Sequence, residues 1–83
     1  MNKKKLFKEI IQSRGKNILF TDFVVILKAF GFRLDRSNGS HHIFIHKSNK
    51  HMISVQCDGK DAKAYQIKQF ISIIEKFNLK MED

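Results

Sequence analysis

The sequence contains one cysteine, no proline and no tryptophan. The single thiol, Cys57, excludes an intramolecular disulfide and any zinc site built from several cysteines. Such sparse cysteine usage is typical of proteins in a reducing compartment, so we expect a cytoplasmic protein.

Long apolar runs are also missing. None approaches the roughly 20 residues that a helix needs to span a bilayer. The first five residues are basic, like the start of a secretory signal. Lys8, Glu9 and Gln12 then interrupt the segment that follows, so the apolar part of a signal peptide does not form. We therefore expect an intracellular protein with no transmembrane segment.

The sequence does contain enough apolar residues for one small core. The chain has 83 residues and a mass of 9.8 kDa, 42% of its residues are apolar, and eight are phenylalanine. A chain of this length folds around a single core, and this hydrophobicity argues against intrinsic disorder. Because the sequence has no repeat and no linker, residues 1–83 are expected to form one domain.

Positive charge is in excess. Sixteen Lys and Arg residues against eight Asp and Glu residues give a formal net charge of +8 and an isoelectric point of about 9.9. Such an excess attracts polyanions, which include nucleic acids, anionic membrane surfaces and acidic proteins. Charge alone leaves these three classes of partner open.

The first predicted helix covers residues 3–14 and is ended by Gly15. Its apolar side consists of Leu6, Phe7, Ile10 and Ile11. A basic amphipathic helix can lie on a membrane, but four apolar residues are few for that role. We therefore expect this helix to pack against the core, and we expect no membrane partner.

Two more helices are predicted. Residues 22–30 form one, with Thr21 as its N-cap and Gly31 as its stop. Residues 63–77 form the last, because apolar residues recur along it with the helical period. Gln66 falls outside that apolar stripe.

Three short strands are predicted between the second helix and the last. Residues 32–36 alternate apolar and charged side chains, and residues 40–47 and 51–57 have the composition of strands. Asn38-Gly39 is a strong hairpin signal, since both positions tolerate positive φ. We expect consecutive strands to pair in an antiparallel sheet.

The expected fold class is α+β. The elements follow the order α-α-β-β-β-α, and removing the first helix leaves α-β-β-β-α. This order predicts a three-stranded antiparallel sheet with the helices on one face, which is the topology of double-stranded RNA-binding domains. We therefore expect such a core over residues 20–79, preceded by a helical extension over residues 1–19.

Histidine can both give and take a proton near neutral pH, and the predicted sheet is rich in it. The four residues are His41, His42, His46 and His51. The last three could approach a metal, but no cysteine or carboxylate cluster completes such a ligand set. We therefore expect no metal and no other cofactor. Catalysis by one histidine and a plain surface role for all four both stay open.

A family resemblance rests on the middle of the chain. The motif is a Gly-Phe strand start, then Gly-Ser-His-x-x-aromatic, then a second apolar strand. The chain carries it as Gly31-Phe32, Gly39-Ser40-His41 and Phe44. With these residues in this order, in a chain of matching size, the sequence resembles the HicA (YcfA-like) toxin family over residues 20–79.

The resemblance implies the toxin of a type II toxin-antitoxin system. Such toxins have a fold similar to double-stranded RNA-binding domains, cleave mRNA and are neutralised by a HicB-like antitoxin protein. Their catalytic residue is the histidine of Gly-Ser-His, which is His41 in this chain. The chain departs from the family pattern in its extra N-terminal helix and in lacking a proline at the end of the third strand. These departures leave the substrate and the antitoxin open.

The residues around His41 suit RNA cleavage. A base must take the 2′-hydroxyl proton, and cations or N–H donors must stabilise the phosphorane. Ser40 and the amides of its turn can hold a phosphate next to His41. Basic residues of the hairpin and the last helix can contact the flanking phosphates. These RNA-binding candidates are Arg33, Arg36, Lys47, Lys50, Lys60, Lys63 and Lys68.

Two adjacent histidines compete for the catalytic role. If Ile43 and Ile45 face the core, alternation turns His41 toward the helix-covered side. The same alternation puts His42, Phe44 and the later His46 on the open face. The motif favours His41 and the alternation favours His42 as the freer side chain, so His41 is the first candidate and His42 the second.

Two classes of function follow. One is a metal-independent endoribonuclease that uses a histidine as general acid or base. The other is a non-catalytic module that binds RNA or protein with the same fold. Both predict a basic surface with affinity for RNA, so cleavage that depends on His41 separates them. DNA binding is disfavoured because the sequence has no helix-turn-helix signal.

Overall fold

The computed structural model describes residues 2–82 and has three helices and one antiparallel sheet. The elements are α1 (Lys3–Ser13), α2 (Phe20–Ala29), β1 (Phe32–Asn38), β2 (His41–His46), β3 (Met52–Asp58), β4 (Asp61–Ala62) and α3 (Ala64–Phe77). The strands lie side by side in the order β1-β2-β3-β4, so each pairs with its neighbour in sequence. The α+β class predicted from the sequence is confirmed.

The prediction of three strands is wrong, because the sheet has a fourth. After β3 the chain reverses through Gly59, which has a φ of +64°, and Ala62 pairs with Cys57. Asp61 is also bridged to Leu19 from the connection between α1 and α2. A strand of two residues is too short for an alternating pattern, so the sequence carries no periodic signal for it.

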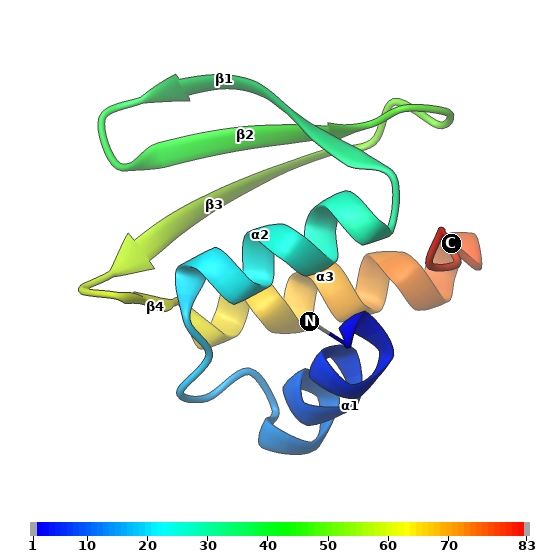
Figure 1. Ribbon diagram of the computed structural model, residues 1–83. Helices are drawn as coiled ribbons and strands as arrows, with labels where there is room; N and C mark the ends of the chain where they lie inside the picture. Colours follow the sequence, from blue (N-terminus) through cyan, green and yellow to red (C-terminus); the bar gives the residue numbers. More distant parts are fainter. Residues whose placement is uncertain (1, 83) are drawn as a thin grey trace.

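The helices are layered on one side of the sheet (Figure 1). α2 and α3 cover one face, and α1 packs against these helices on the side away from the sheet. The rings of Phe7 in α1 and Phe30 after α2 are 4.9 Å apart, and Phe23 and Phe70 meet edge to face at 5.4 Å. Within residues 2–82, no helix covers the other face of the sheet.

The start of α2 also differs from the prediction. The helix begins at Phe20, its N-cap is Leu19, and no side chain caps it, so Thr21 is not the N-cap. The N–H of Phe20 donates to the carbonyl of Lys60 at 2.9 Å. A backbone carbonyl of the β3–β4 turn therefore satisfies the first N–H group of the helix.

The two faces of β2 are the reverse of the expected ones. Phe44 and His46 are buried, with 2% and 7% of their surface exposed, and they face the helices. Ile43 and Ile45 lie on the open face and are half-buried, and His41 is exposed there.

The pairing with β3 explains this reversal. Ile53 and Val55 of β3 are buried against the helices, and the register sets Phe44 opposite Ile53 and His42 opposite Val55. Residues paired across an antiparallel sheet share a face. Phe44 therefore packs in the core between the sheet and the helices, and Ile43 and Ile45 lie on the open face.

Candidate active site

His41 lies at the start of β2, directly after a two-residue turn. Gly39 in that turn has a φ of +63°, a conformation that favours glycine, and Asn38 pairs with His41 across it. The hairpin signal of Asn38-Gly39 is thus confirmed. The His41 side chain is exposed on the open face of the sheet, so the prediction that alternation turns it toward the helix-covered side is wrong.

Two carboxamide side chains flank His41. Its register partners are Asn38 in β1 and Gln56 in β3. Paired residues share a face, so the imidazole stands between two groups that can each donate and accept hydrogen bonds. Sequence reasoning named Asn38 only as part of the hairpin turn and did not name Gln56 as a site residue, because only the strand register brings Gln56 next to His41.

His42 is held on the opposite side of the strand. Its Nδ1 lies 3.1 Å from the carbonyl oxygen of Ser40, which can only accept, so Nδ1 is the donor. The His42 ring also packs at 5.2 Å against the ring of Phe20 at the start of α2. The expectation that His42 is the side chain on the open face is therefore wrong.

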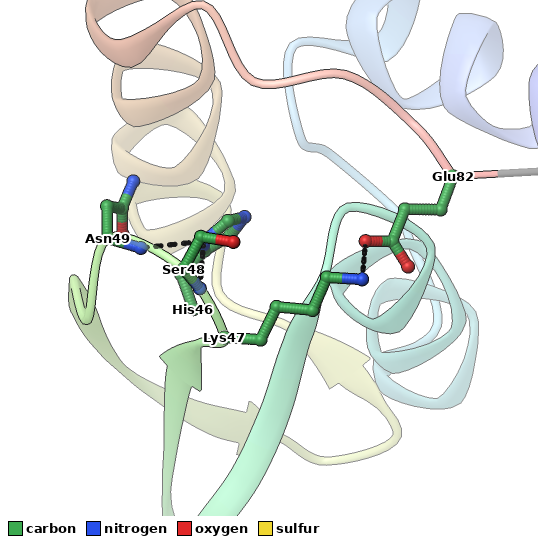
Figure 2. Close-up of polar contacts among 5 residues, drawn as sticks. All are labelled: His46, Lys47, Ser48, Asn49 and Glu82. Carbon is green, nitrogen blue, oxygen red and sulfur yellow. Dashed lines mark hydrogen bonds and ion pairs between the residues drawn. The ribbon is translucent and has the colours of Figure 1, made fainter.

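His46 supports the turn at the far end of β2 (Figure 2). Its Nδ1 accepts the backbone N–H groups of Ser48 and Asn49 at 3.2 and 3.3 Å. Nδ1 must therefore carry the lone pair and Nε2 the proton. A Cβ at Gly31 would lie 3.0 Å from Nε2 of His46, so the site has no room for a larger residue.

The C-terminal residues close over the same end of the sheet. Glu82 forms an ion pair with Lys47 (Figure 2). Its backbone N–H donates to the carbonyl of Ala29 at 2.7 Å. His51, at the start of β3, has its ring 5.1 Å from the ring of Phe77. These contacts mark the region around His46 and His51 as structural.

The predicted RNA-binding residues fall into two groups. Lys47 and Lys50 lie beyond the end of β2 that is opposite to His41, about 20 Å away at roughly 3.3 Å per residue. Lys47 is also occupied by its ion pair with Glu82. Arg33 belongs to this distant half, because it pairs with Ile45. The structure does not bring these three cations to His41.

The second group lies at the His41 end of the sheet. Arg36 pairs with Ile43 on the open face and contacts Asp35 at 3.1 Å. Lys60 lies in the β3–β4 turn and Lys63 is the N-cap of α3. Ser40 is exposed beside His41, and Lys68 is exposed one turn into α3.

Two helices also begin at this end of the sheet (Figure 1). The contact between Phe20 and His42 locates the start of α2. A hydrogen bond of 2.7 Å from the N–H of Gln56 to Oε1 of Gln66 locates the start of α3. Because helix N-termini carry partial positive charge, they add to the potential that attracts an anion.

The described residues, 2–82, contain no group of three or more His, Cys, Asp or Glu side chains that could hold a metal ion. Over the same residues, no helix has the length and apolar character needed to cross a bilayer.

Comparison with known protein families gives one match. The model of the HicA toxin of bacterial toxin-antitoxin systems matches residues 20–77. Comparisons with curated proteins and with solved structures found no match. The matched region contains the whole sheet, α2, α3 and the Gly39-Ser40-His41 turn, and it confirms the resemblance drawn from the motif. This chain belongs to the HicA toxin family.

Proposed function

We propose that the protein is an mRNA-cleaving endoribonuclease of a type II toxin-antitoxin system, with His41 as its general acid or base. The observation that carries the proposal is the position of this histidine in a HicA family chain: exposed on an open sheet face, directly after the Gly39-Ser40 turn. The order α2-β1-β2-β3-α3 supports a relation to double-stranded RNA-binding domains, and a cytoplasmic location follows from an mRNA substrate.

The proposed reaction uses the 2′-hydroxyl of the RNA as nucleophile. Neutral His41 takes the 2′-hydroxyl proton as the 2′-oxygen bonds to phosphorus. The bond from phosphorus to the 5′-oxygen breaks, and that oxygen takes a proton from water, whose hydroxide then takes the proton held by His41. The products are a 2′,3′-cyclic phosphate and a 5′-hydroxyl, so the reaction needs no external nucleophile, and the proposed enzyme is metal-independent.

The surroundings of His41 favour the negative charge of this reaction. Lys60 and Lys63 lie at the same end of the sheet, as do the N-termini of two helices. Positive groups fixed in place before the reaction stabilise charge that develops in the transition state. The hydroxyl of Ser40 and the turn amides add donors for a phosphate oxygen.

A HicB-like antitoxin is the proposed protein partner. The chain carries a net charge of +8, and none of the helices that the structure describes covers the face with His41. An acidic protein is attracted quickly to such a surface, and covering the open face blocks the approach of RNA to His41.

The test compares two neighbouring histidines on a defined mRNA. We expect His41→Ala to lower the cleavage rate by about 10²–10⁴-fold, the range for loss of a general acid–base group. His42→Ala is the control and should lose much less. Gel analysis gives the rate, and circular dichroism checks folding.

Two outcomes would contradict the proposal. Full cleavage by His41→Ala would remove His41 from the mechanism. RNA binding without any cleavage by the unmodified protein would indicate a non-catalytic binding module.

A further inference from the structure

Gln66 is a buried polar side chain at the start of α3, with 5% of its surface exposed. Its Oε1 accepts the backbone N–H of Gln56 in β3 at 2.7 Å, and its Nε2 donates to the hydroxyl of Tyr65 at 3.4 Å. A buried amide is costly unless its polar atoms are satisfied. The contact with Gln56 therefore joins the helix layer to the sheet at one defined strand position.

The ladder between β2 and β3 shows where the N–H of Gln56 points. The N–H of His46 donates to the carbonyl of His51 at 2.9 Å, which identifies a hydrogen-bonded pair. Such pairs alternate with non-hydrogen-bonded ones along an antiparallel ladder, and the pair of His41 and Gln56 is five residues further along. It is therefore non-hydrogen-bonded, and the N–H of Gln56 points away from β2.

On that other side the sheet has no strand to accept the N–H of Gln56. β4 has only two residues, and it pairs with Cys57 and Asp58. The chain then turns into α3, with Lys63 as the N-cap of the helix. The side-chain oxygen of Gln66 takes the place of the missing carbonyl, and without it this N–H would lose its partner.

The same geometry brings the Gln56 side chain close to His41. In a non-hydrogen-bonded pair the Cα atoms are about 4.5 Å apart, the closest approach in an antiparallel sheet. The Gln56 carboxamide shares the open face with the imidazole and offers two N–H donors. A phosphate held at His41 lies within reach of such a donor.

We propose that Gln56 is a further residue of the His41 site, where its carboxamide donates to an oxygen of the scissile phosphate. Gln66 is its positioning residue, since it fixes the backbone from which that carboxamide extends. This inference rests on the proposed function. It adds a phosphate contact that the motif around Gly39-Ser40-His41 does not contain.

The first measurement is the single-turnover cleavage rate of Gln56→Ala. This change removes the carboxamide and leaves the backbone N–H bonded to Gln66. We expect the rate to fall about 10²–10³-fold, as when a donor to a developing oxyanion is lost. Affinity for RNA, measured in a His41→Ala background, should change less than about 2-fold. Ser54→Ala is the matched control, since Ser54 lies on the same strand and face opposite Ile43, and it should keep the full rate.

The second measurement separates positioning from plain stability. Gln66→Met removes the acceptor at similar size, and should lower both Tm and the cleavage rate. In a Gln56→Ala background, Gln66→Met should lower Tm by the same amount. It should not lower the cleavage rate further, because the Gln56 carboxamide that Gln66 positions is absent. Gln66→Glu keeps an acceptor oxygen in the first turn of α3, where a negative charge is favourable, and should retain cleavage within about 3-fold.

Each outcome has a distinct meaning. Full activity of Gln56→Ala beside an inactive His41→Ala would overturn this inference and leave the proposed function intact. If Gln66→Met lowered the cleavage rate equally in the unmodified and the Gln56→Ala proteins, Gln66 would not act through Gln56 and would not be its positioning residue. No cleavage by the unmodified protein would overturn the proposed function and this inference together.

Discussion

At the scale of single residues, the four histidines have four different surroundings. His41 is exposed on the open face, and His42 is tied to a backbone carbonyl on the helix side. His46 is buried and accepts two N–H groups, and His51 packs on a phenylalanine ring. Of the four, only His41 combines exposure with a position on the uncovered face among the described residues. Closeness in sequence therefore does not give neighbouring histidines the same chemistry.

The structural role assigned to His46 can be tested directly. His46→Leu fills a similar volume but cannot accept the N–H groups of Ser48 and Asn49. We expect the free energy of unfolding to fall by about 1–3 kcal/mol, the usual penalty for leaving buried donors unsatisfied. Urea denaturation measures this change. His41→Leu, at an exposed position, should stay within about 0.5 kcal/mol of the unmodified protein, and equal losses at both positions would contradict the assignment.

Gln66 shows a limit of reading single residues from the sequence. The helical stripe correctly excludes it from the apolar positions, yet the structure buries it. Its burial is explained by the unpaired N–H of Gln56, and that need arises only because β4 is too short to reach it. A partner ten residues away in another element leaves no periodic signal.

At the scale of elements, local signals predicted most of the fold. The three helices follow from hydrophobic period, the three longer strands from alternation or strand-forming composition, and the hairpin from Asn38-Gly39. β4 and the start of α2 were mispredicted, since both depend on backbone pairing of residues 18–20 with residues 60–62. Contacts between distant segments override local capping preferences.

The face of β2 is a further case where local pattern was insufficient. Both sets of alternating residues in this strand contain apolar side chains, so period alone could not decide which set is buried. The pairing with β3 determines which set is buried, because Ile53 faces the helices and its register partner Phe44 shares that face. This reversal is what exposes His41, so the candidate residue could be named from the motif but its surroundings could not.

The N-terminal helix lies outside the residues matched to the family, yet it is part of the core. Ile10 in α1 is fully buried, whereas its neighbour Ile11 has 46% of its surface exposed. We expect Ile10→Ala to lower the free energy of unfolding by about 2–4 kcal/mol, as for other buried large-to-small changes. Ile11→Ala is the matched control, and a loss below about 1 kcal/mol is expected there. Urea denaturation would disprove the packing of α1 if the two variants were equally stable.

At the scale of the whole molecule, the positive charge is distributed over opposite sides. Residues 1–19 hold six basic residues and one acidic residue, a net charge of +5 out of the total of +8. α1 lies beyond α2 and α3 from the sheet, so its charges are far from His41 (Figure 1). A short RNA on the open face is therefore expected to meet Arg33 and Arg36 on that face, and Lys60 and Lys63 at its His41 end.

This distribution predicts a salt dependence smaller than the net charge suggests. Each phosphate neutralised on single-stranded RNA contributes about −0.7 to the slope of log K against log salt, so four cations give about −3. Binding of a short RNA to the His41→Ala protein, measured from low to physiological salt, should show this slope. Lys60→Gln with Lys63→Gln should weaken the slope by about 1.4, whereas Lys4→Gln with Lys8→Gln on α1 should leave it unchanged. If Lys4→Gln with Lys8→Gln weakened the slope as much as Lys60→Gln with Lys63→Gln, RNA would be contacting α1 on the far side of the molecule. If the affinity of the His41→Ala protein for RNA did not change with salt, the open face would not be an RNA-binding surface.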